Sequence, residues 1–164
     1  MPNRRFVSLL TGTTVVAVSV ALVAQSPQAL ERFIGTWKQN IAKSKYSPGP
    51  GPKSQTVVIK VSEGGLLATG DFVNAQGQHQ QNQVEIPEKF DGKDYPVKAA
   101  PQPATRSFKW IDDSTIEWVT KVNGKQTATT RASLSRDGKI QTLTTTGTNA
   151  QGQNFQNVVV LEKQ

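Results

Sequence analysis

The stretch from Thr115 to Thr146 reads TIEWVTKVNGKQTATTRASLSRDGKIQTLTTT, and it decides the fold. Two turn dipeptides, Asn123-Gly124 and Asp137-Gly138, interrupt a run of threonine, valine and alanine that is typical of strands. Both dipeptides suit two-residue type I′ turns, in which the two central residues need positive φ. They divide the stretch into three predicted strands, residues 115–122, 126–134 and 140–146. Adjacent antiparallel strands of this kind form a meander, which must bury one face or close on itself.

The flanking sequence repeats the strand pattern, with Val57, Ile59 and Val61 on one face of residues 56–61. Further strands are predicted from Gly35 and at residues 66–73, 80–86, 105–111 and 155–162. Two proline-containing segments are predicted to be loops, residues 43–54 and residues 87–104, the second with a short strand at 95–97. Roughly nine or ten strands result. So many strands either split into a sandwich or close, and sequential hairpins favour an all-β, antiparallel up-and-down β-barrel of about 8–10 strands.

Composition bounds the chemistry of this chain. Its 164 residues suit one domain, and the 35% share of hydrophobic residues predicts a thin or partly polar core. With no cysteine and a single histidine, His79, the chain can form no disulfide and no cysteine- or histidine-based metal cluster, so we expect no metal and no cofactor. The formal net charge of +7 suits anionic lipids, acidic polymers or carboxylate ligands. The basic residues are scattered, which argues against nucleic-acid binding.

The first 26 residues have the pattern of a secretory signal peptide. Arg4 and Arg5 precede an apolar run from Val15 to Ala24, which is too short to span a bilayer comfortably, and small residues follow. The sequence therefore predicts a leader over residues 1–26, a single barrel domain over 27–164 with a short N-terminal helical turn, and a secreted or periplasmic protein. We expect no stable membrane insertion after cleavage; the alternative is an uncleaved membrane anchor.

Two further patterns bear on function. Residues 74–82 echo residues 149–157, which suggests two similar hairpins in the two halves of the chain; the alternative is convergent turn chemistry. No catalytic motif emerges: His79 lies in a glutamine-rich turn, and Asp112-Asp113 lies in turn context. The sequence predicts that the protein is not an enzyme.

A resemblance to known families adds to this reading. Residues 33–38, FIGTWK, resemble the opening strand of the calycins, the lipocalin and fatty-acid-binding superfamily. Residues 124–131 and 137–139 are similar to late strands of fatty-acid-binding proteins, and residues 160–163 resemble the end of those proteins. The stretches at 35–38, 43–50, 91–97 and 147–153 are similar to a group of lipocalin-like secreted bacterial proteins of uncharacterised function. The resemblance implies a calycin-like barrel.

The same resemblance implies roles for individual residues. Trp37 and Gly35 would form the closed base of the barrel, under a short N-terminal helical turn. Arg131 matches an inward arginine that holds a ligand carboxylate; the alternative is an arginine that faces solvent. Val159 and Leu161 stand where the family has a second arginine and a tyrosine, so that carboxylate site is at best half present. The candidate cavity-lining residues are Phe72, Phe108, Trp110, Trp118 and Leu161, for which core filling is the alternative.

The expected function is that of a monomeric, secreted protein that binds a small hydrophobic or amphipathic ligand, a lipid or a fatty-acid-like molecule, inside the barrel. The alternative is an envelope or carbohydrate-binding barrel, or a structural barrel with a filled interior and no small-molecule ligand. Binding to carbohydrate would use the amide-rich hairpin tips, residues 74–83 and 149–157.

Overall fold

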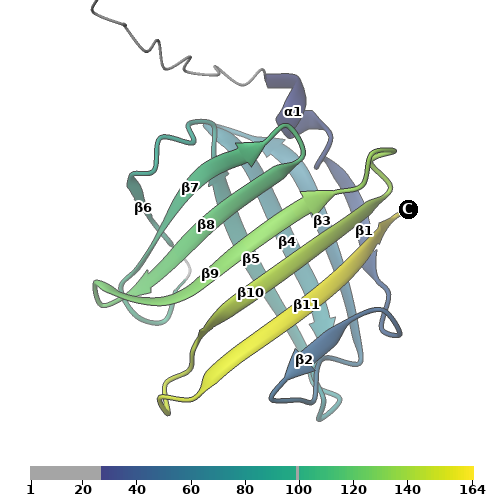
Figure 1. The fold of residues 1–164 in the computed structure, drawn as a ribbon, viewed down its shortest axis with the longest axis vertical. Coiled ribbons are helices and arrows are strands. Elements are labelled where there is room, and N and C mark those ends of the chain that lie inside the picture. Colours follow the sequence, from purple (N-terminus) through teal and green to yellow (C-terminus); the bar gives the residue numbers. More distant parts are fainter. Residues whose placement is uncertain (1–26, 99) are drawn as a thin grey trace, which may run out of the picture.

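The structure, a computed structural model, describes residues 27–98 and 100–164. The predicted leader therefore lies outside the described residues. One antiparallel sheet curls into a barrel, and a short helix sits at one end of it (Figure 1). The elements are α1 (Pro27–Glu31), β1 (Gly35–Gln39), β2 (Lys45–Ser47), β3 (Ser54–Ser62), β4 (Gly65–Val73), β5 (His79–Pro87), β6 (Asp94–Pro96), β7 (Ala104–Asp112), β8 (Thr115–Val122), β9 (Lys125–Leu134), β10 (Ile140–Thr148) and β11 (Asn154–Lys163). Within the described residues, no helix is both long and apolar enough to cross a bilayer.

The strand order is that of an up-and-down barrel. Around the sheet the strands run β5-β4-β3-β1-β11-β10-β9-β8-β7-β6, and β2 adds to β11. The first and last long strands pair, with Trp37 opposite Lys163 and Gln39 opposite Leu161. The predicted antiparallel barrel is thus confirmed. It is nearly closed: along this order β5 and β6 are the two end strands, and a slot lies between them.

Of the two predicted type I′ turns, the structure contains the one at Asn123-Gly124 but not the one at Asp137-Gly138. Asn123 and Gly124 both have positive φ, 50° and 75°, as a type I′ turn requires. At Asp137-Gly138 only Gly138 has positive φ, and the Asp137 carboxylate instead accepts hydrogen bonds from the Ser135 hydroxyl and the Lys139 amide. The prediction of a second type I′ turn was therefore wrong, because an aspartate that accepts local hydrogen bonds stabilises a longer loop.

Two segments predicted as loops contain short strands. Residues 45–47 form β2, which pairs with residues 156–158 of β11, so the first segment is not loop throughout. In the second segment a short strand was predicted at 95–97, and β6 covers 94–96. Prolines keep both strands to three residues.

The core is concentrated at the end of the barrel that α1 covers. Trp37 is fully buried, and its indole nitrogen donates a hydrogen bond to the Phe33 carbonyl at 2.8 Å. Gly35 has φ of +138°, and a Cβ there would lie 2.8 Å from Lys163 Cε. The Lys163 ammonium lies over the Trp37 ring. The structure thus places Trp37 and Gly35 beneath α1, where the base role was expected.

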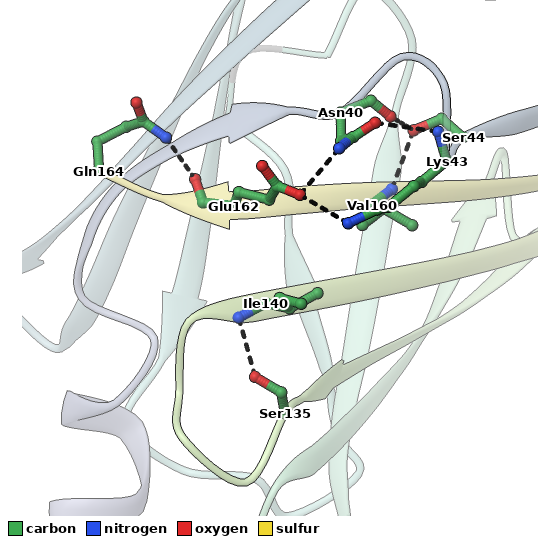
Figure 2. A network of polar contacts seen from close by, with 8 residues as sticks. All are labelled: Asn40, Lys43, Ser44, Ser135, Ile140, Val160, Glu162 and Gln164. Carbon is green, nitrogen blue, oxygen red and sulfur yellow. Dashed lines mark hydrogen bonds and ion pairs between the residues drawn. The ribbon is translucent and has the colours of Figure 1, made fainter.

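A polar network holds the seam between β1 and β11 (Figure 2). Glu162 Oε1 accepts hydrogen bonds from the Asn40 amide at 2.8 Å and from the Lys43 ammonium at 3.1 Å. The Ser44 hydroxyl donates to the Asn40 carbonyl and accepts from the Val160 amide. Hydrogen bonding from Asn40, with Lys43 second, lowers the pKa of Glu162. The seam therefore joins the two ends of the described chain through charged as well as backbone hydrogen bonds.

The two echoing segments form matching hairpin tips at the end opposite α1 (Figure 1). In each tip the asparagine amide donates to the glutamine side chain four residues later, Asn74 to Gln78 and Asn149 to Gln153. The backbone amides of the same glutamines donate back to the asparagine side chains. The repeated sequence therefore specifies a repeated turn geometry.

Candidate functional site

A cavity of about 320 Å³ lies at the slot between β5 and the β6–β7 pair. Three apolar residues on its wall, Leu66, Ile86 and Phe108, belong to the buried core. Its polar lining includes Arg106, Tyr95, Gln83, Glu63, Glu85 and Lys98. The cavity thus combines an apolar inner wall with a charged outer rim.

The alternation of β7 brings Arg106 to this cavity. Phe108 and Trp110 belong to or pack against the buried core, and Arg106 falls on the same face by strand parity. Lys109, on the opposite face, is exposed and pairs with Glu117. The two aromatic residues of this face were expected to line the cavity, but Arg106 was not. Parity with Phe108 was the signal that would have identified it.

Arg106 buries two of its three guanidinium nitrogens without compensation. Its Nε and Nη1 atoms are inaccessible to solvent and have no hydrogen-bond partner. Burial alone lowers the pKa of Arg106, with no contribution from a neighbouring carboxylate. An unpartnered buried donor is unfavourable by about 1–3 kcal/mol, and more for a charged group. Such groups are rare in folded proteins and call for a functional or structural reason.

Two ion pairs join the segments beside the cavity. The Lys98 ammonium lies 3.0 Å from Glu85 Oε1 and so links the segment after β6 to β5 across the slot. The Lys121 ammonium lies 2.7 Å from Asp94 Oδ2 and links β8 to β6. The side chains of both pairs are partly exposed, so each pair contributes at most about 1 kcal/mol to the stability of the fold. Only the Lys98–Glu85 pair crosses the slot, so the two slot edges are held together weakly.

Three of the five expected lining residues, Phe108, Trp110 and Trp118, pack in one aromatic cluster with Phe90. The Phe108 ring centroid lies 5.9 Å from that of Trp118 and 5.8 Å from that of Phe90. Trp110 stacks at a tilt on Phe90, with centroids 5.0 Å apart. Phe108 and Leu161 are buried in the core, and only Phe108 of the five expected residues lines the slot cavity. Leu161 lies beside Gln39 and Gln141 in the interior.

Arg131, expected as an interior anchor, instead lies on the outer face of β9. Its neighbours Thr130 and Ala132 are buried, so strand alternation turns Arg131 toward solvent, with 55% of its side chain exposed. Its guanidinium binds Glu117 Oε2 at 2.8 Å, and Lys109 binds the other oxygen at 2.8 Å. Hydrogen bonds from Lys109 and then Arg131 lower the pKa of Glu117. The structure thus keeps Arg131 away from the interior and places Arg106 at the cavity.

A second cavity, of about 370 Å³, opens at the end of the barrel opposite α1. Phe72, another expected lining residue, lies here with Tyr46, Gln55 and Asn82, next to the tip that begins at Asn74. The Tyr46 hydroxyl accepts a hydrogen bond from the Gln39 amide, and burial raises the pKa of Tyr46. This mouth is therefore lined by amides and aromatic rings rather than by charges.

The candidate catalytic groups are dispersed. His79 lies 3.7 Å from Asp71 Oδ1, and both side chains are at least half exposed at the mouth. Asp112 accepts hydrogen bonds from the Ser114 amide and hydroxyl, which is turn chemistry. Within residues 27–98 and 100–164, no three histidine, aspartate or glutamate side chains are arranged to hold a metal ion.

Comparison with solved structures identifies the architecture. A Schistosoma mansoni fatty-acid-binding protein in complex with arachidonic acid aligns with a TM-score of 0.50 at 10% identity, over 83% of this chain and 98% of that one. The fold is a calycin-like barrel. Two other structures align with lower scores: zebrafish ileal bile-acid-binding protein complexed with cholic acid (TM-score 0.47, 12% identity, 81% of this chain and 99% of that one) and As-p18, an extracellular fatty-acid-binding protein (TM-score 0.49, 12% identity, 82% and 97%).

Comparison of the sequence with family models and with curated proteins finds no match. The calycin-like barrel therefore gives the architecture, and the function has to be argued from the residues of the site.

Proposed function

We propose that this chain is a binding protein for a small hydrophobic or amphipathic molecule held inside the calycin-like barrel. The observation that carries the proposal is the slot cavity, in which the buried residues Leu66, Ile86 and Phe108 face a space of about 320 Å³. Sites for small molecules are typically concave, mostly apolar and about 300–1,000 Å³ in volume. Burial of a ligand here contributes roughly 0.8 kcal/mol for each methylene removed from water.

Two further observations support the proposal. The interior near the slot also holds the rings of Phe90, Trp110 and Trp118, which pack with Phe108. The structure that aligns with a TM-score of 0.50 is a fatty-acid-binding protein solved with arachidonic acid. Binding rather than catalysis fits the dispersed positions of His79 and Asp112.

The test is a titration of the purified chain with N-phenyl-1-naphthylamine, a neutral probe whose fluorescence rises in apolar surroundings. We expect saturable enhancement and displacement by dodecanol. Val97, which is half-buried on the cavity wall after β6, gives the blocking variant Val97→Trp, because the larger side chain occupies the slot. Gln102 is exposed in the same connection and outside the cavity, so Gln102→Trp is the matched control.

The expected result is a loss of probe binding of about tenfold or more in Val97→Trp and no change in Gln102→Trp. A tenfold loss corresponds to about 1.4 kcal/mol, the burial of roughly two methylenes. Linear, unsaturable fluorescence in the unmodified chain would contradict the proposal. So would equal binding by both tryptophan variants when circular dichroism shows that both are folded.

A second candidate function is favoured by the mouth opposite α1. Gln55, Asn82 and the tip from Asn74 line a cavity that also contains Tyr46 and Phe72. Amides that hydrogen-bond hydroxyls, beside aromatic rings that stack, suit a carbohydrate. Retention on a glycan array that is lost in Phe72→Ala, with no response to the neutral probe, would support this candidate over the first.

We also propose that the chain is exported, with residues 1–26 removed. The support is the basic start and short apolar run of the sequence. Fractionation of a bacterial host that expresses the full chain, followed by mass spectrometry, should find a protein that begins near Ala24–Pro27 outside the cytoplasm. A full-length chain that stays with the inner membrane would indicate an uncleaved anchor instead.

A further inference from the structure

Arg106 carries a positive charge that the described chain does not balance. Its Nε and Nη1 atoms are buried without hydrogen-bond partners, and Arg106 lines a cavity that opens at the slot. Elsewhere in the described chain, the arginine of the neighbouring barrel wall, Arg131, binds Glu117 at 2.8 Å. The difference indicates that the partner of Arg106 comes from outside the protein.

The two carboxylates that line the cavity do not serve as that partner. Glu85 lies on the same rim but is bound to Lys98 at 3.0 Å. Glu63 also lines the cavity, and neither it nor Glu85 contributes to the shifted pKa of Arg106, whose one cause is burial. The hydroxyl of Tyr95, which sits opposite Arg106 in the β6–β7 pairing, donates to Asp91 instead.

The surroundings of Arg106 divide into a polar side and an apolar side. Thr120 stands opposite it on β8, and strand parity puts the threonine hydroxyl on the same face as the guanidinium. Phe108, two residues along β7, is buried on that face and belongs to the cavity wall together with Leu66 and Ile86. A molecule bound here would meet a cation at one end and hydrocarbon along its body.

We infer that Arg106 binds the anionic head group of the amphipathic ligand, a carboxylate or a phosphate monoester, with the ligand's apolar body against Leu66, Ile86 and Phe108. This inference rests on the proposed function, because it specifies the class of ligand for the same cavity. Arginine suits the role, since its planar guanidinium offers two parallel donors to carboxylate or phosphate oxygens and stays charged at all ordinary pH values. The head group lies at the slot, and neutral ligands of equal length bind more weakly because they leave the guanidinium without an anionic acceptor.

The test compares three competitors with the same tail, dodecanoate, dodecyl phosphate and dodecanol, for displacement of N-phenyl-1-naphthylamine from the purified chain at about pH 7.5. We expect at least one anion to bind about tenfold or more tightly than the alcohol, as a charge-assisted hydrogen bond implies. Which anion binds better identifies the head group. The preference should persist in about 0.5 M NaCl, because salt screens a buried pair much less than an exposed one.

Three variants locate the preference. In Arg106→Gln the ratio between anion and alcohol should fall to about one, while dodecanol binds within about twofold of its original affinity. Arg106→Lys keeps the charge without the paired donors, so it should retain part of the ratio. Arg131→Gln removes the same charge from the outer face and should leave the ratio unchanged.

The outcomes separate this inference from the proposed function. Equal binding of anions and alcohol by the original chain, or a ratio that survives in folded Arg106→Gln, overturns the head-group site while the apolar cavity stands. Absence of any probe binding removes the proposed function itself. If Arg106→Gln fails to fold by circular dichroism, the ratio in Arg106→Lys decides, and an undiminished ratio there overturns the inference.

Discussion

Replacing Arg106 with methionine should make the ligand-free protein more stable. Two guanidinium nitrogens, Nε and Nη1, are buried without partners, and each unsatisfied buried donor is unfavourable by about 1–3 kcal/mol. Methionine keeps an unbranched stem that packs against Phe108 and brings no donor into the cavity. Because Arg106 is only partly buried as a residue, we take the lower part of the summed range. The expected gain in the free energy of unfolding is about 1–3 kcal/mol.

The assay is urea unfolding of delipidated protein, followed by circular dichroism, with Arg131→Met as the matched control. Arg131 is exposed and binds Glu117, so its replacement should lower the stability by up to about 1 kcal/mol, the opposite sign. The lowered pKa of Arg106 means that the charged form is held less well in the folded state than in the unfolded state. That penalty applies at every pH below the folded-state pKa, so the gain should be equal at about pH 5 and about pH 9.

A methionine variant that is less stable than the original chain would refute the reasoning. It would mean that ordered water or an unrecognised partner already satisfies the guanidinium, and the case for a ligand anion at Arg106 would weaken with it. A gain confined to one end of the pH range would equally contradict the argument, because it would point to a titrating neighbour rather than to burial.

Two other predictions concern the frame of the barrel. Trp37→Ala should lower the free energy of unfolding by about 3–5 kcal/mol in the same assay, because the side chain is fully buried. Trp37→Phe should lower it by about 1–2 kcal/mol, because this change loses chiefly the hydrogen bond to the Phe33 carbonyl. Equal effects of the two substitutions would contradict this prediction. Glu117→Gln should lower it by about 1 kcal/mol at neutral pH by weakening the bonds to Lys109 and Arg131. Since these bonds lower the pKa of Glu117, its contribution to the free energy of unfolding is present above the unfolded-state pKa of 4.5 and is lost as the pH falls through the lower folded-state pKa. A stability difference between the original chain and Glu117→Gln that grows in acid would argue against the pairing.

The architecture could be predicted from the sequence because strand length, alternation and turn residues all act locally. Asn123-Gly124 specifies its turn through backbone conformations that few other dipeptides adopt. The meander then fixes the neighbours of each strand, and the pairing of β1 with β11 follows from closure. The Asp137-Gly138 turn escaped this reasoning because the Asp137 carboxylate binds Ser135 and Lys139, and side-chain hydrogen bonds of this kind cannot be read from the dipeptide alone.

The site was harder to predict because it depends on which face of each strand turns inward. A family resemblance suggested an inward Arg131, with a solvent-facing arginine as the alternative, although the strand has Ala132 and Leu134 on the other face. The alternation of apolar residues was the stronger signal, and it turns Arg131 outward. The same rule applied to β7 places Arg106 on the face of Phe108, so local parity would have selected the arginine that lines the cavity. The position of the slot could not be predicted without the full strand order.

The slot and the arginine have one cause in the sequence. Pro96 ends β6 after three residues, and Pro101 and Pro103 follow before β7 begins, so this connection cannot form a full-length strand to pair with β5. In a barrel closed at this point, Arg106 would be sealed in the interior, where a charge without a partner is strongly unfavourable. The open edge instead places Arg106 on the wall of a cavity at the slot, and the ion pair between Glu85 and Lys98 crosses the opening without neutralising the guanidinium. An unpaired strand edge and an unpaired charge are each destabilising alone, and their coincidence at one cavity is the physical reason to expect an anion there.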